Sequence, residues 1–66
     1  MKVLVNNKEV EIAEQSTITQ LTQFLRLPDK GVAIAVDNKM VPKTEWNDFT
    51  LKENAHVVII KAACGG

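Results

Sequence analysis

The segment Val57-Val58-Ile59-Ile60 gives the strongest strand signal in the chain and decides how its sheet is built. A strand that is apolar on both faces normally lies in a sheet that is covered on both sides. The rest of the sequence predicts one substantial helix, so the chain itself can cover only one face of this sheet. Two of the four side chains must then lie on an open face. We assign Val57 and Ile59 to the core and Val58 and Ile60 to the open face, although the pattern alone does not fix this phase.

The open face would carry a small apolar patch. Leu4, in the strand expected to lie beside the last one, would join Val58 and Ile60 there. A contiguous exposed apolar patch on a small protein often marks the contact surface of a partner. Leu4, Val58 and Ile60 are therefore the candidate partner interface.

The first part of the chain, residues 1–13, predicts a β-hairpin. Apolar and polar residues alternate on both sides of Asn6-Asn7-Lys8. Asparagine tolerates the left-handed conformations that tight hairpin turns require, so this segment is a good turn. In the second strand, Val10 and Ile12 should face the core while the intervening glutamates face water, which is typical of a sheet with one wet face.

A helix should follow the hairpin. Thr17 and Gln20 fit a capping box, in which each side chain bonds the backbone N–H of the other residue. The apolar residues that follow form one stripe at helical spacing: Ile18, Leu21, Phe24 and Leu25. Pro28 is expected to end the helix, because the residue before a proline is disfavoured in the helical region. Such a helix of two to three turns would pack on one face of a sheet.

The second half of the chain is again rich in strands. Residues 32–36 and 39–41 predict two strands joined by a turn at Asp37-Asn38, and Pro42 ends the second of them. Residues 43–49 predict a short helical turn whose aromatic side chains, Trp46 and Phe49, cap the core. The fold class is thus α+β, a mixed four- to five-stranded sheet with one main helix on one face. Residues 1–66 form a single domain, with a flexible tail expected at 62–66.

Composition and charge exclude several functions. The chain is 45% hydrophobic and 24% charged, and its eight basic and eight acidic residues leave a net charge of zero. It lacks the basic field that non-specific nucleic-acid binding needs and the polybasic arm of a membrane-surface protein. One cysteine and one histidine, His56, permit neither an internal disulfide nor a protein-only zinc site, so no metal is expected. With no signal peptide or membrane span apparent, we expect a cytoplasmic protein.

The chain ends in Cys64-Gly65-Gly66. Glycine gives up the most backbone entropy on ordering, so two final glycines suit a structured element poorly. A tail without side chains can instead lie extended in a narrow channel and present its α-carboxylate to an active site. The glycines alone do not distinguish such a tail from a frayed or artificial end.

The whole chain resembles the β-grasp, ubiquitin-like sulfur carriers, and most closely the ThiS family of thiamin biosynthesis. The resemblance rests first on Thr17, which opens a helix, and on the run from Val32 to Val36 that leads into Asp37-Asn38. It rests also on Val41-Pro42 with Trp46 four residues after the proline, and on a final diglycine at the expected distance from the last strand. Two features depart from the family pattern. Asn54-Ala55 stands where members commonly have Gly-Asp, and Cys64 is no family signature.

The resemblance implies a protein co-substrate rather than an enzyme, with no catalytic residue of its own. A ThiF-type adenylating enzyme would activate the Gly66 carboxylate, and sulfur originating from a cysteine desulfurase would convert it to a thiocarboxylate. Gly65 and Cys64 would present this end, and a ThiG-type thiazole synthase would take the sulfur. The chain would bind no cofactor, since ATP is used by the partner and no phosphate-binding loop is present.

Other interpretations stay open at this point. A MoaD-like small subunit of molybdopterin synthase also uses a C-terminal thiocarboxylate, although such chains tend to be longer. A ubiquitin-like modifier or interaction module would have a conjugated or inert tail. Cys64 could form a persulfide, but no flanking histidine or cluster of cations lowers its pKa, so an ordinary tail residue is the simpler interpretation.

Overall fold

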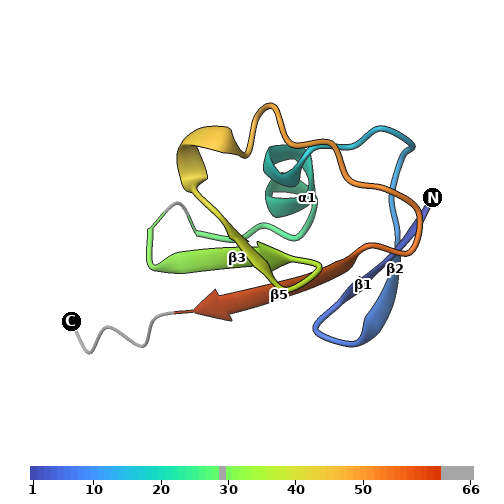
Figure 1. Ribbon diagram of the computed structural model, residues 1–66, viewed down its shortest axis with the longest axis horizontal. Coiled ribbons are helices and arrows are strands. Elements are labelled where there is room, and N and C mark those ends of the chain that lie inside the picture. Colours follow the sequence, from blue (N-terminus) through green and yellow to red (C-terminus); the bar gives the residue numbers. More distant parts are fainter. Residues whose placement is uncertain (29, 62–66) are drawn as a thin grey trace.

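A mixed β-sheet with a helix against one face forms the body of the molecule (Figure 1). The structure is a computed structural model that describes residues 1–28 and 30–61. In these residues five strands lie in the order β2-β1-β5-β3-β4. The elements are β1 (Lys2–Val5), β2 (Lys8–Glu11), α1 (Ile18–Phe24), β3 (Val32–Val36), β4 (Lys39–Val41), the 3-10 helix η1 (Lys43–Glu45) and β5 (His56–Lys61). β1 and β5 are parallel, and the other neighbours are antiparallel.

The first hairpin is built as predicted. β1 pairs antiparallel with β2, with Val5 opposite Lys8. Asn6 and Asn7 form the turn with φ of 51° and 69°, the left-handed conformation that a two-residue hairpin turn requires of both central residues. Ile12, which follows β2, is buried as expected.

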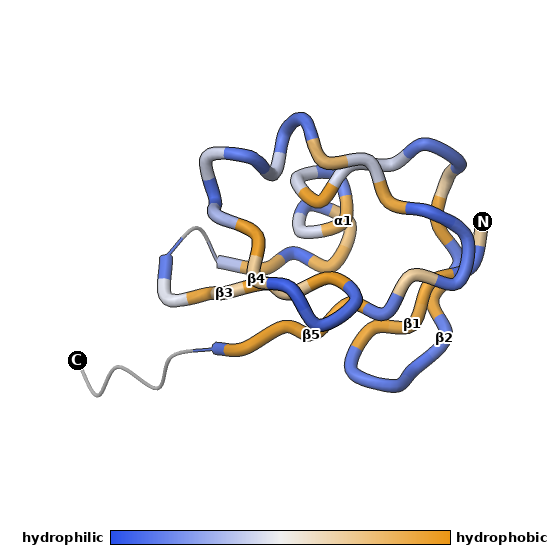
Figure 2. Tube along the Cα trace, viewed as in Figure 1, coloured by the Kyte–Doolittle hydropathy of each residue, from blue (hydrophilic) through white to orange (hydrophobic). Residues whose placement is uncertain are grey.

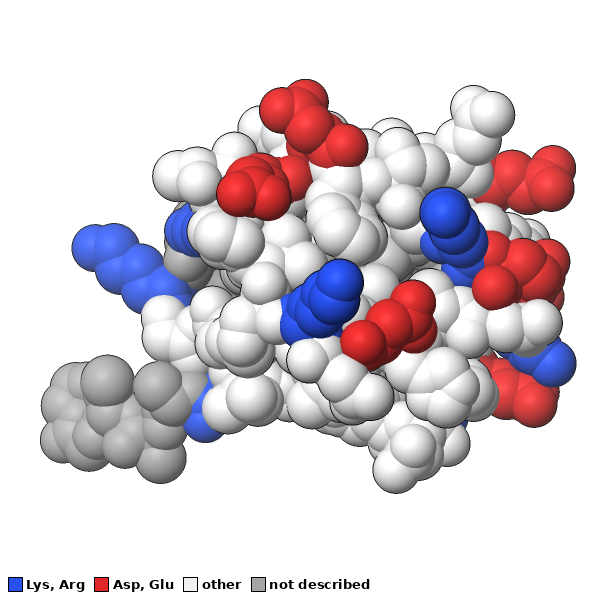
Figure 3. Space-filling model, in the orientation of Figure 1, with Lys and Arg blue, Asp and Glu red and all other residues white. Residues whose placement is uncertain are grey.

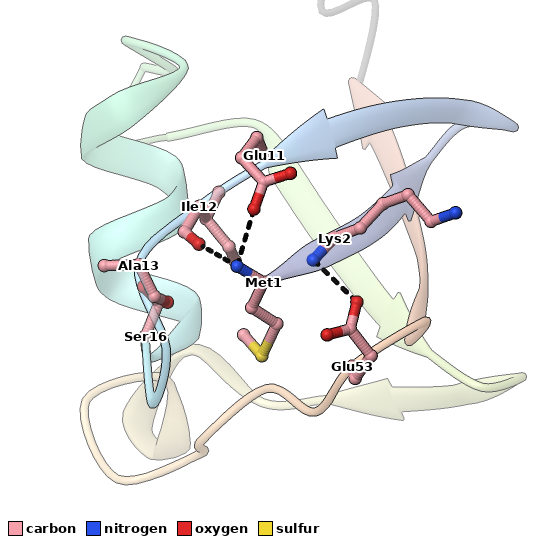
Figure 4. Close-up of polar contacts among 7 residues, drawn as sticks. All are labelled: Met1, Lys2, Glu11, Ile12, Ala13, Ser16 and Glu53. Carbon is pink, nitrogen blue, oxygen red and sulfur yellow. Dashed lines mark hydrogen bonds and ion pairs between the residues drawn. The ribbon is translucent and has the colours of Figure 1, made fainter.

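The start of β1 is held by polar contacts from two other segments (Figure 4). The α-amino nitrogen of Met1 lies 2.6 Å from Glu11 Oε2 and donates to the Ile12 carbonyl oxygen at 2.8 Å. The hydrogen bond to Glu11 raises the pKa of this amino group above its ordinary value of 8.0. The Lys2 N–H donates to Glu53 Oε2 at 2.8 Å. These contacts fix β1, the strand beside which the last strand lies.

The predicted capping box opens α1. Thr17 Oγ1 accepts a hydrogen bond from the Gln20 N–H at 3.2 Å, and Gln20 Oε1 accepts one from the Thr17 N–H at 2.8 Å. Ile18 and Leu21 are buried as predicted, and Leu25 packs partly against the core. Phe24 is 63% exposed, so its assignment to the apolar stripe is wrong. At 3.6 residues per turn it lies about 120° around the helix from Ile18, outside the stripe.

The end of α1 has a different cause from the one predicted. The helix ends at Phe24, before Pro28 could interrupt it. Arg26 adopts φ 57°, and the Leu27 N–H donates to the Thr22 carbonyl oxygen at 2.9 Å. With the Arg26 N–H bonded to the Gln23 carbonyl, this is a Schellman motif, whose left-handed position normally holds glycine.

Replacing Arg26 with glycine should therefore stabilise the fold. Arg26→Gly removes the left-handed penalty of a residue with a Cβ, offset in part by the larger entropy of glycine in the unfolded chain. We expect the free energy of unfolding, measured in urea, to rise by about 0.5–1 kcal/mol. Arg26→Ala is the control, because it removes the same charge and keeps the Cβ. Equal stability of the glycine and alanine variants would contradict this account.

The second half of the chain also follows the prediction. β3 and β4 form a hairpin in which Val36 lies opposite Lys39, and the turn residues Asp37 and Asn38 have positive φ. Trp46 follows η1 and caps the core, since the residue is 6% exposed and its indole donates through Nε1 to the Val41 carbonyl oxygen at 2.9 Å.

The core lies between α1 and the face of the sheet that the helix covers. Its largest fully buried side chains come from four elements: Ile18, Leu21, Ile34, Val3 and Val57. The other face of β3 and β5 has no counterpart of α1 in the part of the chain that the structure describes. The sheet is therefore covered on one side only, as the single predicted helix implied.

Candidate functional site

The open face of the sheet exposes apolar side chains next to the end of the last described strand. In β5, Val57 is buried and Ile59 is half-buried, whereas Val58 and Ile60 are 41% and 50% exposed. This confirms the predicted phase of the strand. Figure 2 shows β5 as a largely apolar segment that ends in a hydrophilic residue, Lys61, before the grey trace.

Neighbouring strands extend this surface. Val58 lies opposite Ala35 of β3, which in turn lies opposite Met40 of β4, and Ile60 lies opposite Ala33. Residues directly opposite one another in a sheet point to the same face. Met40 is 61% exposed. We call this surface the open-face patch, defined as the exposed residues Met40, Val58 and Ile60 with the half-buried Ala33. Ala35, which lies between Met40 and Val58, is buried.

Leu4 has a smaller share in this surface than predicted. Val3 and Val5 are buried, so strand alternation places Leu4 on the open face, where it is half-buried. It lies opposite His56 of β5 rather than opposite Val58 or Ile60. The structure thus brings Leu4 to the margin of the patch. Met40 is more exposed than Leu4 and belongs to the patch, and sequence reasoning missed it.

Charged side chains of both signs lie on the face of the molecule drawn in Figure 3. Asp and Glu side chains gather over the upper and right-hand parts of this face, and Lys and Arg side chains also lie on it. His56 is exposed, and its backbone N–H donates to Asp37 Oδ1 at 3.0 Å. Within residues 1–28 and 30–61, no group of three or more His, Cys, Asp or Glu side chains could hold a metal ion.

The predicted reactive end lies beyond the last strand. β5 ends at Lys61, and Cys64, Gly65 and Gly66 lie outside the described residues. Ile60 is therefore the member of the open-face patch closest in sequence to that end. Among the described residues, no helix has the length and apolar character needed to cross a membrane.

An apolar hollow lies on the other side of the sheet, the side that α1 covers. It has a volume of about 500 Å³ and is lined by the end of β2 and by α1, including Ile12, Leu21 and the exposed Phe24. Among the residues that line it, Glu11 alone has a titratable side chain. The open-face patch, adjacent to the end of β5, is the better candidate site.

The strand order, the central parallel pair and the single covering helix define a β-grasp domain of the ubiquitin-like type. The ThiS family model matches residues 3–66, so the chain belongs to the ThiS family. The chain is 23% identical over 66 residues to the sulfur carrier protein ThiS of Escherichia coli (strain K12), with all of both chains covered. It also resembles the crystal structure of the thiamine biosynthesis protein ThiS from Geobacter metallireducens, with a TM-score of 0.85, 22% identity and full coverage of both chains.

Family membership gives the chain its role. It is a sulfur carrier of thiamin biosynthesis, a carrier rather than a catalyst, and it works with sulfur-transfer partners of that pathway. The predictions of the family and of the β-grasp fold are confirmed.

Proposed function

We propose that this chain carries sulfur as a thiocarboxylate on Gly66, and that the open-face patch docks the enzymes that load and unload it. The observation that carries the proposal is the position of the patch on β5, whose end leads directly into the tail. The six residues beyond Ile60, 61–66, can span at most about 22 Å when extended. An enzyme that covers Ile60 therefore needs its reactive centre within that reach.

The chemistry requires activation by another protein. A carboxylate is a poor electrophile, so an oxygen of Gly66 first attacks the α-phosphorus of ATP in a ThiF-type adenylating enzyme, and pyrophosphate leaves. A persulfide formed by a cysteine desulfurase then displaces AMP through its outer sulfur, which gives an acyl disulfide. A second thiol, such as that of cysteine, cleaves the sulfur–sulfur bond, which releases the thiocarboxylate and leaves a disulfide. A ThiG-type thiazole synthase takes up the sulfur of the thiocarboxylate. ATP belongs to the partner enzyme, and this chain contributes the docking surface and the tail.

A reconstituted loading reaction tests the proposal. The full chain is incubated with ATP, a ThiF-type adenylating enzyme, a cysteine desulfurase and cysteine, and its intact mass is then measured. We expect the mass to increase by the difference between sulfur and oxygen, and only when ATP is present. An unchanged mass with an enzyme that loads the E. coli relative would contradict the proposal.

Loading should not depend on Cys64. No histidine or cluster of cations beside it in the sequence would favour its thiolate, and the proposed reaction uses only the Gly66 carboxylate. Cys64→Ser should therefore reach the same thiocarboxylate yield at a rate within about twofold of the unaltered chain. Loss of the product in this variant would assign the cysteine a part in sulfur transfer.

A further inference from the structure

The strand that leads into the tail loses one of its neighbours halfway along. β1 pairs with β5 only as far as Val5 opposite Val57, and the Asn6 N–H donates to the Val57 carbonyl oxygen at 2.9 Å. On its other edge, β5 pairs with β3 as far as Lys61 opposite Val32. Beyond Val57, the backbone of β5 therefore has a strand on one edge only.

The side chain of Asn6 takes the place of the missing strand. Its Oδ1 accepts a hydrogen bond from the Ile59 N–H at 2.9 Å, and its Nδ2 donates to the Ile59 carbonyl oxygen at 3.4 Å. One carboxamide thus bonds both backbone groups of Ile59, as a paired strand would. We call these two hydrogen bonds from Asn6 to Ile59 the clamp.

Residue 6 must adopt a positive φ and must also bond both backbone groups of Ile59, and few residue types can do both. Asn6 occupies the turn with φ 51°, which glycine, asparagine and aspartate tolerate best. Of these three, only asparagine has both a donor and an acceptor on its side chain. The turn and the clamp therefore require the same residue.

We propose that Asn6 is a positioning residue for sulfur loading, an inference that rests on the proposed function. Ile59 lies between Val58 and Ile60 of the open-face patch and close to the end of β5. The clamp holds this half of the strand in one arrangement, so that the patch and the end of β5 at Lys61 meet the partner as one unit. Without it, a smaller fraction of molecules would be competent to bind, which raises the apparent dissociation constant in proportion.

Two matched substitutions in the same turn test this role. Asn6→Gly keeps the positive φ and removes the clamp. Asn7→Gly keeps the positive φ of its own position, 69°, and leaves the clamp intact. Amide hydrogen exchange of Ile59 and the steady-state kinetics of loading by the adenylating enzyme are measured for both. We expect Asn6→Gly to exchange the Ile59 amide on the order of tenfold faster and to raise the KM for the carrier roughly 3- to 10-fold at unchanged kcat. Asn7→Gly should do neither.

A third variant separates the two hydrogen bonds. Asn6→Asp keeps an acceptor for the Ile59 N–H but places an ionised oxygen against the Ile59 carbonyl. Repulsion between the ionised oxygen and the Ile59 carbonyl should displace the carboxylate and weaken the bond that its other oxygen accepts from the Ile59 N–H. Protection of the Ile59 amide should therefore be lower than in the unaltered chain near neutral pH, and it should recover as the pH falls through the carboxyl pKa, because the protonated group can donate again. A pH-independent protection equal to that of the unaltered chain would overturn the clamp.

Other results with Asn6→Gly and with the unaltered chain also decide whether Asn6 is a positioning residue. Unchanged exchange in Asn6→Gly, or faster exchange without a rise in KM, would overturn the positioning role. Failure of the unaltered chain to accept sulfur would overturn the proposed function and this role with it. Hydrogen exchange would then still report whether Asn6 holds β5, so the two failures can be told apart.

Discussion

Removal of Gly66 should lower the rate of sulfur loading by at least about 100-fold while leaving the fold intact. The deletion withdraws the reactive carboxylate by about 3.5 Å, the length of one extended residue. A misplacement of even 1 Å in an active site can cost about 100-fold, because the reacting atoms no longer meet in line. The loading reaction, followed by intact mass against time, measures the loss.

The stability of the same variant is the control. The buried apolar side chains of the described structure lie between Val3 and Val57, far in sequence from the deleted residue. The free energy of unfolding in urea should therefore stay within about 0.5 kcal/mol of the unaltered value. Loading at the normal rate by the shortened chain would show that the terminal glycine is not the site of sulfur attachment.

A carboxylate in the open-face patch should weaken binding to the adenylating enzyme strongly. Val58→Asp or Ile60→Asp places a charge where the proposed interface excludes water, and substitutions at the centre of an interface often cost about 2 kcal/mol or more. We expect the dissociation constant, measured by titration calorimetry, to rise about 30-fold or more. Neither side chain belongs to the buried core, since 41% of Val58 and 50% of Ile60 is exposed in the free chain, so the fold should tolerate the change.

Phe24→Asp provides a matched control for these two variants. Phe24 is also an exposed apolar residue, but it belongs to α1, on the opposite side of the sheet from the patch. Its replacement should leave binding unchanged. An equal loss of affinity in Phe24→Asp, or normal affinity in both patch variants, would contradict the assignment of the docking surface.

Much of this architecture could be predicted because local signals agreed with one another. The Thr17 and Gln20 pair set the start of the helix, and Asn6-Asn7 set the first turn. Counting helices showed that one face of β5 must be open, but its four apolar residues fit either phase, so the phase itself was an assignment and not a deduction. The structure confirms Val57 as a core residue and Val58 as an exposed one.

The rest could not be predicted because it depends on tertiary contacts or on weak local patterns. β4 is too short for its alternation to reveal that Met40 faces outward. Arg26 gives no sign in the sequence of the left-handed conformation that ends α1. The clamp from Asn6 joins residues 53 positions apart, so it becomes visible only once β5 lies beside the first hairpin.

The location of the transferred sulfur tests the central claim most directly. After loading, the intact chain is fragmented in a mass spectrometer, before and after treatment with a thiol reductant. The account predicts that the oxygen-to-sulfur exchange maps to Gly66 and survives the reductant, because a thiocarboxylate contains no sulfur–sulfur bond. An added sulfur that maps to Cys64 and is removed by the reductant would contradict it, since that is the behaviour of a cysteine persulfide.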